Sequence, residues 1–143
     1  MVTKERQKDF GWQPFLILLG DEPFQFYSKF HKNVQIAVDS NRQRGIENLL
    51  RLPKKPNVIL LDDAFQHRKV TAGLNILLTT YQDLYADDLV LPTGNLREPK
   101  EGAKRAQIIV VTKCPDDISA LEKKQIISKL KPQNNQEVFF SAI

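Results

Sequence analysis

Short apolar runs alternate with amphipathic stretches along this chain, and that alternation limits the folds it can adopt. Each run is aliphatic or β-branched and has polar or turn residues on both sides, as buried strands do. The runs are residues 15–19, 34–38, 58–61, 74–78, 108–111 and 138–140. Parallel strands need crossover connections, so the pattern predicts an α/β domain with a mainly parallel sheet and flanking helices. We expect residues 58–61 to form a central strand, with 34–38 and 74–78 in the same sheet.

Three stretches between the runs have helical features. Residues 23–30 follow two acidic residues, which suit a first helical turn. A second helix begins at Asp39 or Ser40 and ends before Pro53. The third spans residues 119–131, because a serine and a glutamate there have the spacing of a capping box. Its expected buried stripe is Leu121, Ile126 and Leu130.

Composition fits an ordinary globular domain. The 143 residues predict one domain over 1–143, and hydrophobic and charged residues make up 41% and 27% of the chain. Cys114 is the only cysteine, so an internal disulfide is excluded and a reducing compartment is expected. The net charge of +4 suits an acidic ligand or an anionic membrane surface as well as a plain solvated surface. No apolar run approaches the roughly 20 residues that span a bilayer, and residues 1–10 lack the apolar core of a signal peptide.

Paired carboxylates follow the central run. Asp62 and Asp63 come directly after residues 58–61, which is the pattern of a Walker-B element that holds Mg²⁺ at the end of a strand. A turn-capping role is about as common for such acids on pattern alone. Gln66 and His67 follow within a few residues. This density of polar groups favours a ligand-binding site over a turn that only caps itself.

Two further segments carry candidate site residues. Asp21 and Glu22 follow the run at residues 15–19, where they can face a ligand crevice, cap a helix, or do both. Arg97 and Glu98 lie in the loop Leu91-Pro-Thr-Gly-Asn-Leu-Arg-Glu-Pro99. The arginine can hold a phosphate in a bidentate contact and the glutamate can join a metal site, although a surface ion pair is the commoner role of such neighbours.

These motifs resemble a known family. Gly-Asp-Glu-Pro at 20–23, Asp-Asp-Ala-Phe-Gln-His at 62–67 and the loop at 91–99 occur in the order and approximate spacing of tetraacyldisaccharide 4′-kinase. The resemblance covers about residues 20–143, and residues 1–14 do not share it. It implies a partial P-loop NTPase-like domain that uses ATP and Mg²⁺ to phosphorylate the 4′-hydroxyl of the lipid A disaccharide precursor. It also implies a place at the cytoplasmic side of the bacterial inner membrane, and no nucleic-acid partner.

The resemblance assigns roles by position. Asp21 matches the acid that activates the sugar hydroxyl. Asp62 and Asp63 match the Walker-B pair, and Glu98 completes the expected metal set. The expected contacts to phosphates and substrate are Glu22, Gln66, His67 and Arg97. Ala64 stands where many members have glycine, a mild departure.

Larger departures concern the ATP-binding loop. The family has a P-loop, but the six glycines of this chain include no Gly-Lys pair, so no cofactor-binding residue is assigned. The histidine that pairs with the family's catalytic acid also has no counterpart, because His31 and His67 are the only histidines. The chain therefore reads as an internal segment, a truncated gene product or a split gene, inactive by itself. The alternatives are a non-catalytic α/β binding module and a fragment of another P-loop phosphotransferase.

Overall fold

The computed structural model describes residues 25, 28–30 and 34–143. Two compact units divide the chain, one ending at Leu61 and the other spanning Asp62–Ile143. The predicted strand at 15–19 lies outside the described residues, as does half of the predicted helix at 23–30, of which residues 25 and 28–30 are helical. The expectation of one domain over 1–143 stays a prediction.

The first unit contains helix α2, Arg42–Leu50. Its N-cap is Asn41, whose side chain accepts a hydrogen bond from the backbone N–H of Arg44 at 3.2 Å. Asp39, one of the predicted caps, instead accepts two hydrogen bonds from the Arg44 guanidinium, at 2.8 and 2.7 Å. No residue of α2 is buried, and its described contacts include this cap and the ion pair of Arg44 with Asp39.

The two apolar runs of this unit that the structure describes, residues 34–38 and 58–61, do not form strands. Residues 34–38 and 58–61 have no sheet partner among the described residues, so the prediction of a central strand at 58–61 beside 34–38 is wrong. Val58 is 73% exposed and Leu60 is 90% exposed. An apolar run indicates a preference for burial, but a strand also needs a neighbouring backbone to pair its N–H and C=O groups.

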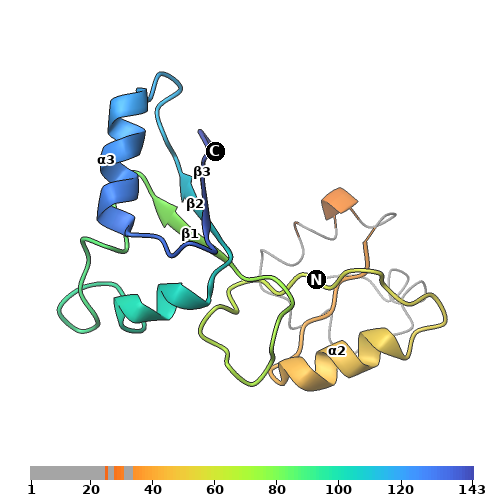
Figure 1. Ribbon diagram of the computed structural model, residues 1–143. Helices are drawn as coiled ribbons and strands as arrows, with labels where there is room; N and C mark the ends of the chain where they lie inside the picture. Colours follow the sequence, from red (N-terminus) through yellow and green to blue (C-terminus); the bar gives the residue numbers. More distant parts are fainter. Residues whose placement is uncertain (1–24, 26–27, 31–33) are drawn as a thin grey trace. The chain divides into compact units, whose positions relative to one another are not determined.

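The second unit is built on a three-stranded parallel sheet (Figure 1). The strands are β1, Ile76–Thr80; β2, Ile108–Thr112; and β3, Glu137–Phe140. Their spatial order is β1-β2-β3, with β2 in the middle. The predictions for β2 and β3 are confirmed, and β1 begins two residues later than the predicted 74–78. The mainly parallel α/β class is therefore confirmed for this unit.

One face of the sheet is covered by helix α3, Ala120–Leu130 (Figure 1). Ile109 and Val111 of β2 are completely buried and belong to one cluster with Ile126 and Leu130 of the helix. Leu121, in contrast, is 66% exposed, so its predicted place in the buried stripe is wrong. Residues 126 and 130 are four apart and share a helix face, whereas a residue five positions from 126 points elsewhere.

The predicted capping box of α3 is confirmed. The Ser119 hydroxyl accepts a hydrogen bond from the backbone N–H of Glu122 at 3.2 Å, and the Glu122 carboxylate accepts one from the backbone N–H of Ser119 at 2.9 Å. The same carboxylate accepts a hydrogen bond from the Tyr81 hydroxyl at 3.0 Å. This contact ties the first turn of α3 to the residue that follows β1. The other face of the sheet is more open, and Leu78 and Phe139 are 64% and 49% exposed.

Candidate functional site

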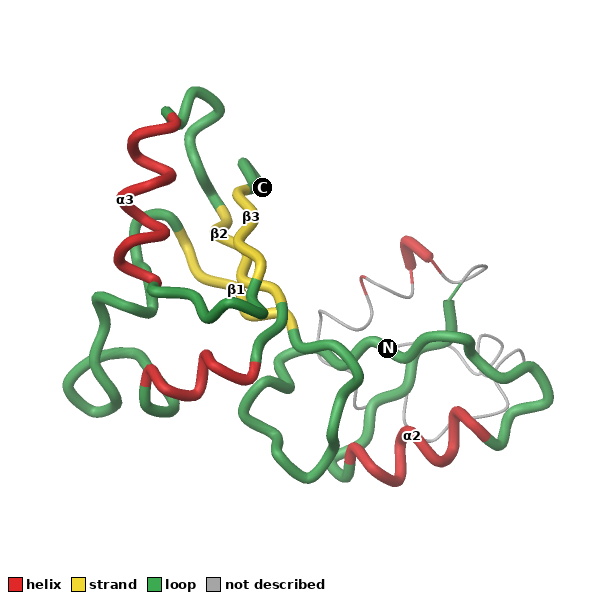
Figure 2. Tube along the Cα trace, viewed as in Figure 1, coloured by secondary structure: helices red, strands yellow, loops and turns green. Residues whose placement is uncertain are grey.

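The paired acids lie in a chain of turns and not at the end of a strand. Residues 51–75 form neither helix nor strand (Figure 2). The backbone N–H of Asp63 donates to the Asp62 carboxylate at 3.0 Å, and that of His67 donates to the Ala64 carbonyl at 2.8 Å. Asp63 has a φ of 43°, a left-handed conformation that aspartate tolerates better than most residues. We call residues 62–67 the acidic turn.

The segment before Arg97 is a closed loop, as predicted. The backbone N–H of Leu96 donates to the Leu89 carbonyl at 3.0 Å, and that of Leu91 donates back to the Leu96 carbonyl at 2.9 Å. Gly94 is required here, because a Cβ at this position would overlap the Leu89 carbonyl oxygen. These contacts fix the position at which the chain leaves the loop, where Arg97 and the following glutamate lie. We call residues 89–98 the Arg-Glu loop.

The acidic turn and the Arg-Glu loop meet at Asp63 and Arg97. The Arg97 guanidinium donates to both carboxylate oxygens of Asp63, at 3.0 and 2.8 Å. Both side chains are open to solvent, with 69% of Asp63 and 61% of Arg97 exposed. The hydrogen bond from Arg97 to Asp63, followed by their charge attraction, raises the pKa of Arg97 above its usual value. The expectation that Arg97 lies near the acidic pair is confirmed for Asp63.

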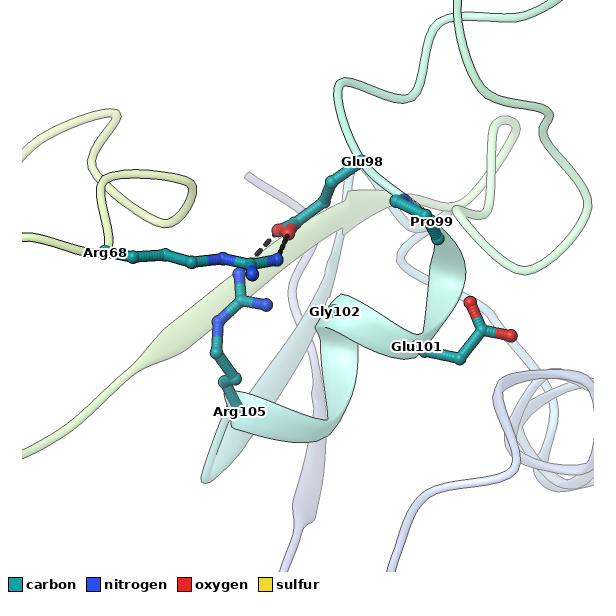
Figure 3. Close-up of a pocket in the computed structure, with 6 residues that line it drawn as sticks. All are labelled: Arg68, Glu98, Pro99, Glu101, Gly102 and Arg105. Carbon is teal, nitrogen blue, oxygen red and sulfur yellow. Dashed lines mark hydrogen bonds and ion pairs between the residues drawn. The ribbon is translucent and has the colours of Figure 1, made fainter.

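Glu98 is held by two arginines from different parts of the unit (Figure 3). Its Oε1 accepts a hydrogen bond from Arg105 at 2.5 Å, and its Oε2 accepts one from Arg68 at 3.0 Å. The carboxylate is largely shielded, with 15% of the side chain exposed. Hydrogen bonding from Arg105, and then from Arg68, holds the pKa of Glu98 below its usual value in spite of partial burial. Glu98 is therefore a charged carboxylate whose two oxygens each accept a hydrogen bond from an arginine.

A shallow pocket of about 270 Å³ surrounds this carboxylate. Glu101 also lines the pocket, but its side chain is directed away from the two guanidinium groups (Figure 3). The complete lining is Arg68, Glu98, Pro99, Glu101, Gly102 and Arg105. The pocket is lined by two cationic and two anionic side chains, and Arg68 and Arg105 already bond Glu98.

Arg105 contacts the site residues but could not be identified from the sequence. It is one of 21 lysines and arginines, and its motif-free surroundings gave no signal. Its partners Phe65 and Glu98 lie 40 and 7 residues away, and neither spacing belongs to a local pattern. Arg68 directly follows the acidic turn in sequence, but its partner Glu98 lies 30 residues away, so no local pattern links the two.

The donors present fit Mg²⁺ in part. Asp62 and Asp63 supply adjacent carboxylates on an exposed turn, and Mg²⁺ is usually bound by one or two protein carboxylates together with substrate phosphates. No group of three or more His, Cys, Asp or Glu side chains suited to a metal ion occurs among residues 25, 28–30 and 34–143. Both oxygens of Glu98 already accept hydrogen bonds from arginines. Its predicted place in the metal set stays a prediction.

The remaining predicted residues are distributed unevenly. Gln66 is exposed and His67 is half-buried, both within the acidic turn. Asp21 and Glu22 lie outside the described residues, so the prediction that Asp21 faces the same crevice as Asp63 stays a prediction. In the part of the chain that the structure describes, no helix is long and apolar enough to cross a membrane.

Fold and site together define an α/β protein in which an acidic turn and an arginine-bearing loop converge. Residues 16–141 match the family described as tetraacyldisaccharide-1-P 4′-kinase, so the chain belongs to that family. It is 62% identical over 128 residues to the tetraacyldisaccharide 4′-kinase of Flavobacterium psychrophilum, covering 88% of this chain and 37% of the relative. For the protein of the same name from Bacteroides fragilis strain ATCC 25285, identity is 53% over 125 residues, covering 87% and 33%.

The chain thus spans about a third of the length of the curated relatives it matches. A more distant relative, the tetraacyldisaccharide 4′-kinase of Porphyromonas gingivalis, is 42% identical over 125 residues, which cover 86% of this chain and 35% of the relative. No solved structure matches the chain. The comparisons confirm the resemblance to this kinase family and its restriction to a segment.

Proposed function

We propose that the chain forms the metal- and substrate-binding part of a tetraacyldisaccharide 4′-kinase. The reaction would transfer the γ-phosphate of ATP to the 4′-hydroxyl of the tetraacyldisaccharide 1-phosphate precursor of lipid A. The observation that carries this proposal is the contact of Arg97 with Asp63, which joins two motifs separated by 34 residues in a chain of this family. By family resemblance, the reaction would take place at the cytoplasmic face of the inner membrane.

The acidic turn supplies the proposed metal ligands. Asp62 and Asp63 would hold Mg²⁺ through their adjacent carboxylates on an exposed turn. Arg97 now bonds both oxygens of Asp63 and would turn to the phosphate when the ion binds. The bound ion would neutralise charge on the phosphate oxygens of ATP. Gln66 and His67 follow in the same turn and would donate hydrogen bonds to phosphate or substrate. Glu98 would either bind the ion as a further ligand or act indirectly, by holding the two arginines that now bond it.

Arg97 is the proposed phosphate contact. Its guanidinium already makes a two-bond contact with a carboxylate, and a phosphate presents oxygens of similar spacing. Its side chain is 61% exposed, so an anionic ligand can reach it from solvent. Asp21 would accept the proton of the attacking hydroxyl, with Glu22 beside it contacting substrate. Both follow from family resemblance.

A binding role without catalysis is the second candidate. The 143 residues contain no Gly-Lys pair, so the backbone cradle and lysine that position ATP phosphates are not among them. Phosphoryl transfer depends on that cradle together with Mg²⁺. We therefore expect the isolated chain to transfer no phosphate, whether it is part of this kinase or a binding module.

A labelled-ATP transfer assay tests the proposal. The matched segment of the Flavobacterium psychrophilum relative is replaced by this chain, and the chimera is compared with the isolated chain. We expect transfer to the lipid disaccharide by the chimera alone. Asp21→Asn in the chimera should lower transfer by about 10²–10⁴-fold, the usual contribution of a general base. Asp116→Asn, an exposed aspartate outside the site, is the matched control and should leave transfer unchanged.

Three results would each contradict a part of the proposal. A chimera that folds but transfers nothing would argue against the kinase assignment and favour the binding module. Robust transfer by the isolated chain would refute the expectation that it lacks an essential part. An Asp21→Asn chimera as active as its Asp116→Asn control would remove Asp21 from the role of base.

A further inference from the structure

Arg105 contacts both motifs of the candidate site although it belongs to neither. It is the last residue of the 3-10 helix η3, Lys100–Arg105. Its Nη2 donates to the carbonyl oxygen of Phe65 at 3.1 Å and to Oε1 of Glu98 at 2.5 Å. Its guanidinium carbon also lies 4.7 Å from the centre of the Phe65 ring. One side chain therefore holds the backbone of the acidic turn and the carboxylate that ends the Arg-Glu loop.

This double contact is more shielded than the contact that it accompanies. The side chains of Glu98 and Arg105 are 15% and 34% exposed, whereas those of Asp63 and Arg97 are 69% and 61% exposed. Water and salt compete strongly with an exposed ion pair. Glu98 is the neighbour of Arg97 in sequence, and Phe65 is two residues after Asp63. The shielded contact therefore constrains both sides of the exposed one.

Gly102 gives independent support for a fixed position of Glu98. A Cβ at Gly102 would lie 2.6 Å from the carboxyl carbon of Glu98 and 2.8 Å from each of its oxygens. The carboxylate thus packs directly against the backbone of η3, in space that only glycine leaves open. Packing on Gly102 and bonding to Arg105 locate the same carboxylate.

We propose that Arg105 is a positioning residue of the candidate site, which sets the relative placement of the acidic turn and the Arg-Glu loop and so of Asp63 and Arg97. The part of this inference that concerns catalysis rests on the proposed kinase function. Arginine suits the task because its planar guanidinium can serve two acceptors and lie over an aromatic ring at once. Lysine keeps the charge but not this geometry. Arg105 acts through the two motifs.

A spectroscopic test on the complete 143-residue chain needs no catalysis. Backbone amide NMR spectra are compared for the unsubstituted chain, Arg105→Gln and Arg68→Gln. The second variant is a matched control, because Arg68 also bonds Glu98 but is 70% exposed. We expect Arg105→Gln to shift or broaden amide signals in both residues 62–67 and residues 95–98. Arg68→Gln should affect mainly its own surroundings and those of Glu98. The methyl signals of Ile109 and Val111 report whether the core stays folded.

Further variants keep the test decisive if Arg105→Gln disturbs the core. Gly102→Ala should displace the Glu98 carboxylate with no change in charge, and so reproduce the changes in the Arg-Glu loop. Arg105→Lys should reproduce the changes in the acidic turn. The proposal is overturned if the signals of residues 62–65 stay unchanged in a folded Arg105 variant, or if Arg68→Gln disturbs those four residues as strongly.

The catalytic part is tested in the chimera with the Flavobacterium psychrophilum relative. Loss of a supporting side chain around a phosphate or metal site typically lowers activity about 10–100-fold. We expect Arg105→Gln to lower kcat by that factor with little change in the KM for the lipid. Arg105→Lys should restore only a small part of the lost kcat. Full recovery with lysine would overturn the geometric role. A chimera that is inactive without substitution contradicts the proposed function, and the amide spectra then decide the positioning role alone.

Discussion

Two apolar runs of equal length have opposite fates in this molecule. Residues 58–61 and residues 108–111 are each four aliphatic residues between polar neighbours. In the second unit, Ile109 and Val111 are completely buried in β2, which pairs with a strand on each side. In the first, Val58 and Leu60 are 73% and 90% exposed. Equal sequence patterns therefore do not ensure equal structures.

The difference lies in the partners. β2 has β1 and β3 for its backbone groups and α3 for its apolar face, so every requirement of a buried strand is met. Residues 58–61 have no strand partner among the described residues. A run of this kind gains stability only where another surface completes it. The core strands and the exposed run thus predict very different responses to the same substitution.

Truncating a core residue should have the largest effect. Ile109→Ala removes fully buried atoms and should lower the free energy of unfolding by about 2–5 kcal/mol. Leu60→Ala, the matched substitution in the exposed run, should change it by less than about 0.5 kcal/mol. Urea unfolding followed by circular dichroism measures both. A large loss with Leu60→Ala would show that residues 58–61 are buried in solution and would break the comparison.

Removing a helix cap should have a moderate effect that differs between the units. Ser119→Ala deletes one half of the capping box of α3 and should lower the free energy of unfolding by about 1 kcal/mol. Asn41→Ala removes the corresponding cap of α2, which buries no residue, so its effect should stay local. For Asn41→Ala, hydrogen exchange measured by mass spectrometry should be faster in residues 42–50 and little changed in residues 120–130. If α2 and α3 of the unsubstituted chain were equally protected from exchange, this would argue that α2 is packed.

The smallest expected effect is a pH dependence confined to the second unit. The pKa of Glu98 is lowered from 4.5, first by its hydrogen bond from Arg105. Because the folded-state value is the lower one, the stabilisation is complete above the unfolded pKa and is lost as pH falls through the folded pKa. Unfolding free energies measured between about pH 6 and about pH 3 should fall more steeply for the unsubstituted chain than for Glu98→Gln. Parallel curves would show that the arginines do not lower the pKa of this carboxyl group.

The proximity of Arg97 to the acidic turn was predictable from the sequence, whereas the other contacts of the two motifs were not. Asp63 and Arg97 were identified as site residues from their motifs, and the structure brings them together. Glu98 was also identified, but its two arginine partners were not. The motifs name residue types suited to phosphate and metal chemistry. They do not say which other side chains will neutralise a shielded carboxylate.

What the sequence determined by itself is local. Ser119 and Glu122 are three residues apart, the spacing at which each side chain can bond the other's backbone, and it correctly predicted the start of α3. These contacts form wherever the chain takes up the local conformation, because few backbone angles separate the partners.

Only the tertiary structure decided the contacts of Arg105 and the fate of residues 58–61. Phe65 and Arg105 are 40 residues apart, so their contact depends on how the intervening strand and loops close. The exposure of Leu60 depends in the same way on whether another backbone lies beside it. A sequence pattern records what a segment prefers to bury or bond. The neighbours that satisfy that preference are chosen by the packing of the whole unit.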